Sequence, residues 1–326
     1  MTGNGALELK VAGNKAADEA GNKNDVTTQT ITGIVVDNTP PTISSPAEGT
    51  YTKANVTPVY SDINYSHATV SLNSGVDEEY EGEEITAEGI YVLTVYDKAG
   101  NSNDVTFTID KTLPTVEVVK AAGTVYANKE GEVELNVIFT DTYLKEAILE
   151  EKDITVKVNG SKIEDVVIEI GEVVGEGTDT VTYPVTLTGL TGNGTLEVTI
   201  AAGLAADEAD NKNASKTQGF ADIIIDNTKP EVTMTKNIGS GSFINTAGDK
   251  GTAKVDVTFT DTYLKTTELQ IADILEVKVG GAIVTPGISV SSVSRNRKHE
   301  NLYSNSNRID RKWSIGVKGS REQSSR

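Results

Sequence analysis

Apolar residues recur at every second position along most of this chain, which is the period of a β-strand with one buried and one exposed face. The three-and-four spacing of an amphipathic helix is nearly absent. The alternating faces, in chain order, are Ala68, Val70 and Leu72; Tyr91, Leu93 and Val95; Val105, Phe107 and Ile109; Val133, Leu135, Val137 and Phe139; Ile154, Val156 and Val158; Val166, Ile168 and Ile170; Val181, Tyr183, Val185 and Leu187; Leu196, Val198 and Ile200; and Ile223 with Ile225. The pattern predicts an all-β fold of short strands in two-layer sandwiches.

Two local signals refine this strand pattern. Asn159-Gly160 separates two alternating runs and is a favoured two-residue hairpin turn. Pro184 lies inside another run and has no N–H to donate to a ladder. We therefore expect Pro184 at a sheet edge or a bulge.

The chain repeats itself at long range. Residues 3–41 align without a gap on residues 192–230, at a constant offset of 189. Residues 139–145 recur as residues 259–265, at an offset of 120. Repeats at such spacing predict a tandem array of like modules, each with its own core.

The repeats also predict where the modules begin and end. Residues 1–39 match the last two strands of a truncated module, residues 40–112 form a short module, and residues 113–228 form a longer one. Residues 229–293 match only the first part of a further module. A lone hairpin is marginally stable in water, so we expect residues 1–39 to be poorly ordered or to pack on a partner.

The composition changes abruptly near Arg295. No Arg precedes that position, whereas six of the last 32 residues are Arg, and the only Trp, Trp313, lies among them. We interpret residues 294–326 as a disordered basic tail that arose from a shifted reading frame or a truncation. A native basic tail is the alternative.

Charge and cysteine content exclude several functions. The 326-residue chain has a formal net charge of −19, which disfavours nucleic acid as a partner. It has no Cys, so it forms neither disulfides nor thiolate metal sites. No apolar run approaches the ~20 residues of a membrane-spanning helix, and the opening residues show no signal-peptide pattern.

Acids and amides recur at equivalent places in each module. In a sandwich of this plan, the linker Asp, the loop after an early strand and the loop before the last strand all meet at one end of the module. These positions are Asp37, Asp62, Asp97 and Asn101 at the first junction; Asp110, Asp141, Asp207 and Asn211 at the second; and Asp226 and Asp261 at the third.

Clustered carboxylates repel one another unless a cation or a proton neutralises them. Carboxylate, amide and carbonyl oxygens suit Ca²⁺, which would fix the angle between modules. The alternative is that these Asp and Asn residues only form turns. Ca²⁺ is the candidate ion, and no cofactor is required.

Catalysis is not expected. His67 and His299 have no spaced partner for a metal or a nucleophile. The acidic run from Glu78 to Glu84 is typical of a solvated surface.

Two phrases resemble a known family. Tyr-x-Leu-x-Val-x-Asp-x-Ala-Gly-Asn, from Tyr91 to Asn101, and Ile-Asp-Lys-Thr-x-Pro, from Ile109 to Pro114, are similar to the tandem bacterial immunoglobulin-like (Ig-like) modules of large surface proteins and adhesins. The resemblance implies a non-catalytic stalk at the bacterial cell surface or outside the cell, whose partners are neighbouring modules. The alternatives are an adhesin that binds a host protein or glycan, and an accessory region of a secreted hydrolase. Membrane insertion is not expected.

Overall fold

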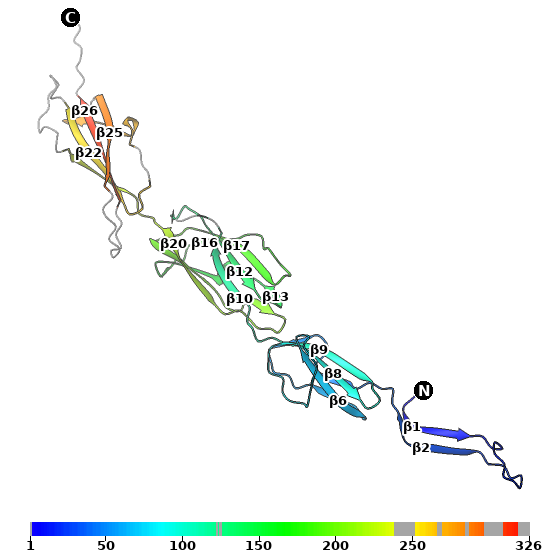
Figure 1. Ribbon diagram of the computed structural model, residues 1–326. Coiled ribbons are helices and arrows are strands. Elements are labelled where there is room, and N and C mark those ends of the chain that lie inside the picture. Colours follow the sequence, from blue (N-terminus) through cyan, green and yellow to red (C-terminus); the bar gives the residue numbers. More distant parts are fainter. Residues whose placement is uncertain are drawn as a thin grey trace, which may run out of the picture. The chain divides into compact units, whose positions relative to one another are not determined.

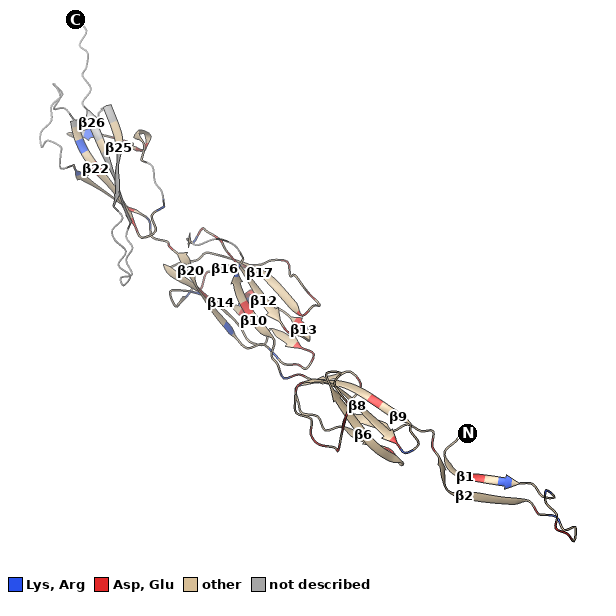
Figure 2. Ribbon diagram, in the orientation of Figure 1, with Lys and Arg blue, Asp and Glu red and all other residues tan. Residues whose placement is uncertain are grey.

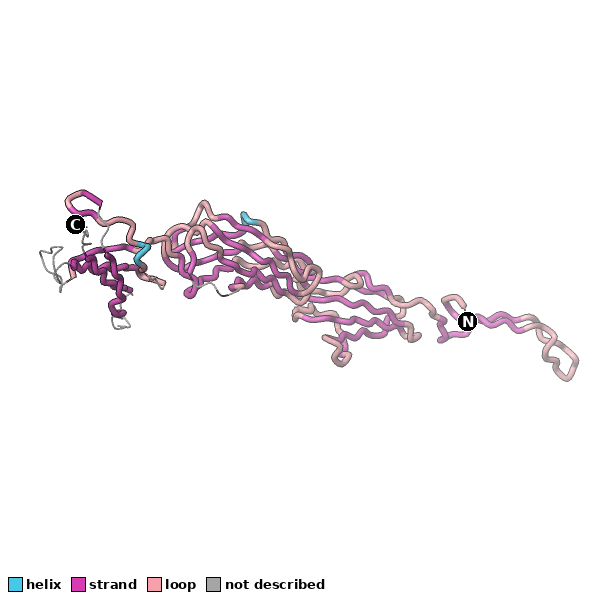
Figure 3. Tube along the Cα trace, turned by 90° about the horizontal axis from the view of Figure 1, so that it is seen from above, coloured by secondary structure: helices cyan, strands magenta, loops and turns pink. Residues whose placement is uncertain are grey.

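The computed structural model describes residues 2–121, 123, 126–237, 252–265, 269–283, 287–296 and 309–318. Strands and loops make up almost all of this described chain, with two single-turn 3₁₀ helices, η1 (Glu151–Asp153) and η2 (Ile271–Asp273), as Figure 3 shows. The prediction of an all-β fold is confirmed. The chain divides into two compact units, Met1–Ile225 and Asp226–Arg326.

The first unit opens with a hairpin. Strand β1 (Gly5–Val11) pairs antiparallel with β2 (Thr27–Val36), with a bulge between Ala6 and Glu8. Strands β18 (Gly194–Ile200) and β20 (Lys216–Ile225) of a later module have the same register and a bulge at the same place, 189 residues on. The hairpin therefore has the backbone of the last two strands of a module.

The short module is a sandwich of a five-stranded and a two-stranded sheet. The larger sheet has the order β4-β9-β8-β6-β7 and the smaller one pairs β3 with β5. The strands are β3 (Thr42–Ser45), β4 (Thr50–Thr52), β5 (Val59–Ser61), β6 (Tyr65–Leu72), β7 (Glu78–Glu79), β8 (Gly89–Asp97) and β9 (Ser102–Ile109). Strands β6, β8 and β9 can be followed in Figure 1.

The longer module has two larger sheets. One has the order β10-β12-β17-β16 and the other β11-β20-β18-β14-β15, while β13 and β19 form a small pair at one end. The strands are β10 (Thr115–Lys120), β11 (Tyr126–Ala127), β12 (Val133–Thr140), β13 (Leu144–Ala147), β14 (Ile154–Val158), β15 (Ser161–Lys162), β16 (Val167–Ile170), β17 (Thr180–Thr188), β18 (Gly194–Ile200), β19 (Ala205–Asp207) and β20 (Lys216–Ile225).

The alternating residues fill two separate cores. Leu93, Val95 and Phe107 are fully buried in the short module, and Phe139 and Leu187 in the longer one. Each core collects residues of its own module only. Burying one face of each strand from water is the main stabilisation of either sandwich.

Both local signals agree with the structure. Asn159 and Gly160 both have positive φ and join β14 to β15, as predicted. Pro184 lies within β17, between β12 and β16, and not at a sheet edge. Its carbonyl accepts the N–H of Gly171 just beyond the end of β16, and the next bridge joins Val174 to Thr182, one residue out of register. Pro184 therefore lies beside a bulge, as expected, and its missing N–H faces that irregular side.

The second unit contains a four-stranded sheet of order β21-β22-β26-β25 and a small hairpin, β23-β24. The strands are β21 (Glu231–Lys236), β22 (Thr252–Asp261), β23 (Lys278–Val279), β24 (Ala282–Ile283), β25 (Gly287–Asn296) and β26 (Ile309–Lys318). This order matches β10-β12-β17-β16 of the longer module, strand for strand.

The expectation of a wholly disordered tail from residue 294 is wrong for Ile309–Lys318. This segment forms β26 and pairs with β22 and β25. Trp313 lies opposite Val257, as Tyr183 lies opposite Val137 in the longer module. Trp313, Ile315 and Val317 alternate with polar residues, which is the pattern of a strand, although the segment is basic. Residues 297–308 and 319–326 lie outside the described residues, and the reading-frame interpretation stays a prediction.

Candidate metal centre at the module junctions

Linkers of one length and sequence pattern join the modules. Each begins with an Asp directly after the last strand and ends at a Pro four residues on: Asp37 to Pro41, Asp110 to Pro114 and Asp226 to Pro230. In all three linkers, Oδ1 of this Asp accepts the backbone N–H of the Thr two residues later, at 2.9 to 3.0 Å. This Asx turn fixes the direction of the linker and leaves Oδ2 for other contacts.

Three acids meet at the junction between the short and the longer module. Asp110 comes from the linker, Asp141 follows β12, and Asp207 ends β19. All three side chains are buried, and one carboxylate oxygen from each lies within 4.8 Å of the other two. Ca²⁺ binds oxygen at about 2.3–2.6 Å, so a single ion can reach three oxygens at this spacing. The sequence prediction that these three acids converge agrees with the structure.

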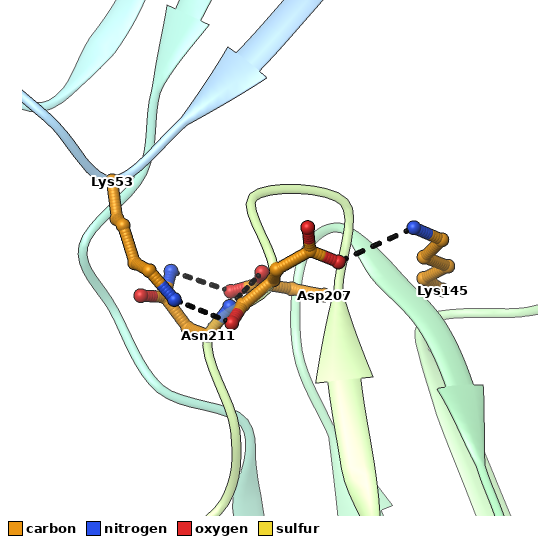
Figure 4. Close-up of polar contacts among 5 residues, drawn as sticks. Lys53, Lys145, Asp207 and Asn211 are labelled. Carbon is orange, nitrogen blue, oxygen red and sulfur yellow. Dashed lines mark hydrogen bonds and ion pairs between the residues drawn. The ribbon is translucent and has the colours of Figure 1, made fainter.

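Asn211 braces this cluster as a donor. Its N–H and its Nδ2 donate to Oδ1 and Oδ2 of Asp207, both at 2.8 Å (Figure 4). The same Nδ2 donates to the backbone carbonyl of Asp110 at 2.9 Å. These donated hydrogen bonds position Asp207 and the linker carbonyl, while the prediction that Asn211 is a cation ligand stays a prediction.

Burial disfavours the charged form of the carboxylates in the second cluster. Burial raises the pKa of the Asp110 carboxyl, and the charges of Asp207, Asp141 and Glu88 raise that pKa further against the lowering effect of the Thr112 N–H. Burial also raises the pKa of Asp141, with Asp207 and Asp179 adding to it and the Tyr143 N–H opposing it. The site therefore favours a bound proton or a bound cation over bare carboxylates.

The first junction has the same plan with less burial. Asp37, Asp62 and Asp97 each place a carboxylate oxygen within 4.8 Å of the others, but Asp37 and Asp62 are only half-buried. Asn101 Nδ2 donates to Asp97 Oδ2 at 2.7 Å and to the carbonyl of Asp37 at 3.2 Å, as Asn211 does in its own cluster. Burial alone would raise the pKa of Asp97, but hydrogen bonds from Asn101, Ala99 and Gly100 outweigh it and lower that pKa.

The third predicted pair, Asp226 and Asp261, does not form such a cluster among the described residues. Asp226 accepts the Thr228 N–H and Asp261 accepts the Tyr263 N–H, so both make the expected turns. The equivalent of Asp207 and Asn211 is missing from the described part of residues 226–326. Two carboxylates alone are a weaker cation site than three.

Direct contacts also hold the second junction. Lys53 Nζ of the short module donates to the carbonyl of Asp210 of the longer one at 2.7 Å (Figure 4). Within the longer module, Lys145 Nζ lies 3.4 Å from Oδ1 of the same Asp210. The rings of Tyr51 and Tyr143 meet edge to face with centroids 5.2 Å apart. The two sandwiches therefore touch through side chains as well as through the linker.

Sequence reasoning missed several of these residues. Asn64 Nδ2 donates to Asp37 Oδ2 at 2.6 Å, and no pattern around Asn64 marks it for this role. Asn24 and Asn213 each bind four backbone groups around their loops. These two lie 189 residues apart, so the repeat itself contained the signal. Figure 2 shows where acidic residues mark the strands and loops of these modules.

No protein-family model matches the chain, and no curated protein matches it. Among solved structures, the FdeC adhesin of Escherichia coli is similar at 13% identity and a TM-score of 0.35, over 86% of this chain and 88% of that one. Domains 4–9 of the surface layer protein SbsC are similar at 12% identity and a TM-score of 0.25, over 98% of this chain and 44% of theirs. The N-terminal eight Ig domains of Down Syndrome Cell Adhesion Molecule are similar at 9% identity and a TM-score of 0.23, over 94% of this chain and 54% of theirs. At these identities and TM-scores the neighbours carry no argument about function, so the function is argued from the geometry of this chain.

Within the described residues, no helix has the length and hydropathy to span a membrane.

Proposed function

We propose that this chain is a non-catalytic stalk segment of a bacterial surface or secreted protein, and that Ca²⁺ bound at its module junctions stiffens it. One observation carries the proposal: three acids from three separate segments converge at two successive junctions in the same way. An Asx turn needs only local hydrogen bonds, so turn formation accounts for each acid but not for their convergence.

The arrangement would make Ca²⁺ a mechanical element. Asp110 belongs to the linker, whereas Asp141 and Asp207 belong to the following sandwich. An ion held by all three would tie the linker to the end of the next module and restrict its swing. The contacts of Lys53 with Asp210 and of Tyr51 with Tyr143 support the same rigid joint.

Thermal unfolding of the full chain with and without Ca²⁺ tests the proposal. At about 100 times its dissociation constant, an ion bound only to the folded state adds about 2.7 kcal/mol, which corresponds to a rise in Tm of roughly 10 °C for a module of this size. We expect this rise with Ca²⁺ and its loss with chelator. Identical melting curves in the two conditions would remove the calcium proposal.

Matched variants separate the two sites. Asp141→Asn should abolish the Ca²⁺ response of the longer module, whereas Asp62→Asn should act on the short module only. Glu81→Gln is the control, since Glu81 is an exposed acid in the Glu78–Glu84 connection away from either cluster. A Ca²⁺ response equally reduced by Glu81→Gln would indicate nonspecific screening of the acidic surface.

Stiffening needs a separate measurement. Small-angle scattering of the full chain should show a narrower distribution of distances between modules with Ca²⁺ than with chelator. If Ca²⁺ raises Tm but leaves this distribution unchanged, Ca²⁺ stabilises a single module and does not stiffen the stalk.

A further inference from the structure

Strand β5 of the short module lacks a neighbour that its equivalent in the longer module has. Strand β12 lies between β10 and β17, whereas β5 pairs with β3 alone. The bridge between Val56 and Ile85 precedes β5 and does not extend along it. No described residue pairs through its backbone with Val59–Ser61 on the side away from β3. Such an edge has N–H and C=O groups that can pair with a strand of another chain.

A tyrosine cluster (Tyr60, Tyr65 and Tyr80) lies beside this edge in place of a strand. In the longer module, Tyr183 of β17 meets Phe139 edge to face, with ring centroids 6.2 Å apart. Tyr60 of β5 is the equivalent of Phe139, and its ring centroid lies 5.6 Å from that of Tyr65 and 6.3 Å from that of Tyr80. Phe139 is fully buried, whereas Tyr60 is half-buried and Tyr65 is 36% exposed. Part of the tyrosine cluster is therefore open to a partner.

Acidic residues accompany the tyrosine cluster. Tyr80 Oη donates to the backbone carbonyl of Glu83 at 2.8 Å, and burial followed by the charge of Glu83 raises the pKa of Tyr80 to about 12. The exposed acids of this stretch are Asp77, Glu78, Glu79, Glu81, Glu83 and Glu84. In the described part of the chain, none of these acids forms an ion pair. Carboxylates and the faces of aromatic rings both attract Lys and Arg side chains, so the surface beside β5 is complementary to a basic partner.

We propose that the short module binds an extended, basic segment of a partner protein. The segment adds a strand at the open edge of β5 and places Lys or Arg side chains against the tyrosine cluster and the acids of residues 77–84. In strand addition, main-chain hydrogen bonds supply affinity and alternate side chains supply specificity. The site uses none of the junction acids, so it adds a binding role to the stalk that does not depend on Ca²⁺.

Calorimetric titration of the full chain with a short capped peptide, in which valine alternates with lysine, tests the site. Chelator is present throughout, so that Ca²⁺ does not contribute. We expect saturable binding of one peptide per chain. The matched peptide with glutamate in place of lysine should bind at least about tenfold more weakly, because like charges repel. Equal binding of the two peptides, or no saturable binding of the lysine peptide, would overturn the proposal.

Matched variants place the lysine peptide on the tyrosine cluster. Tyr65→Ala should weaken its binding about fivefold and Glu83→Gln about threefold, because each removes an exposed partner of a Lys side chain. Tyr126→Ala and Glu132→Gln change an exposed tyrosine and an exposed acid of the longer module and should bind like wild type. Melting curves check that each variant folds. Wild-type binding by folded Glu83→Gln, or an equal loss in the two control variants, would contradict the assigned surface.

N-methylated peptides test whether the segment binds as a strand. In an extended peptide, the N–H groups of the valines face one edge and those of the lysines face the other. Methylating one set of N–H groups therefore removes the donors from one edge only. One of the two methylated peptides should bind about tenfold more weakly than the parent, because it loses the hydrogen bonds to β5. If both methylated peptides bind like the parent, side chains alone hold the peptide and strand addition is wrong.

Discussion

The acids of the junctions each serve two roles. Asp110 and Asp141 hold a turn with Oδ1, through the N–H groups of Thr112 and Tyr143. Their carboxylates also face one another and Asp207. The sequence could predict which acids meet, because the repeats place them at the same end of each module. It could not predict that Asn101 and Asn211 present their amide nitrogen, since that orientation depends on partners far along the chain.

The raised pKa values of Asp110 and Asp141 predict a pH dependence. A carboxyl with a raised folded-state pKa binds its proton more tightly when folded, so its contribution to stability is greatest below the ordinary pKa of 3.8 and is lost as pH rises through the raised pKa. Without Ca²⁺, Asp141→Asn should therefore be more stable than wild type near pH 7 and lose that advantage near pH 3.5. Calcium-free melting curves across this range measure the difference. A gap between the two proteins that does not change with pH would contradict the assigned cause.

Asn213 predicts a large local effect. Its Oδ1 accepts the N–H groups of Leu204 and Ala205, and its Nδ2 donates to the carbonyls of Ala201 and Ala214. Asn213→Ala leaves two N–H groups of this buried loop without a partner, which costs about 1–3 kcal/mol for each. Denaturant unfolding should show the longer module destabilised by roughly 2–4 kcal/mol. The matched variant Asn24→Ala, in the exposed loop of the hairpin, should leave that transition in place.

At the scale of elements, alternation identified nearly every long strand, including those of both complete cores. It also applied to β26, where Trp313, Ile315 and Val317 alternate, but the basic composition argued against a strand there. Pairing explains the difference: β26 lies between β22 and β25, whose backbone groups can pair with an alternating segment of any charge. The bulge beside Pro184 agrees with the expectation, but the place of β17 inside its sheet could not be predicted, because sheet order depends on contacts distant in sequence.

Two equivalent glycines test how the hairpin differs from a complete module. Gly194 starts β18 with φ +133°, and a Cβ there would lie 2.7 Å from Cβ of Asn159. Gly5 starts β1 with φ +132°, and a Cβ there would meet nothing within 4 Å. Both Gly→Ala changes strain the backbone by about 1–3 kcal/mol, but only Gly194→Ala also collides with a neighbour. Hydrogen exchange should show greater loss of protection around β18 in Gly194→Ala than around β1 in Gly5→Ala; equal losses would contradict the packing difference.

At the scale of the whole molecule, the repeats predicted the succession of modules and the offsets between them. Asp18 and Asn22 of the hairpin are equivalent to Asp207 and Asn211, and Asn22 binds both oxygens of Asp18 in the same way.

Counting the bound Ca²⁺ tests the central claim most directly. Isothermal titration of the full chain is predicted to show two specific Ca²⁺ sites, one site in the Asp141→Asn variant, and none when Asp62→Asn is added to it. Titrations that show no specific binding, or a stoichiometry that these substitutions leave unchanged, would contradict the account.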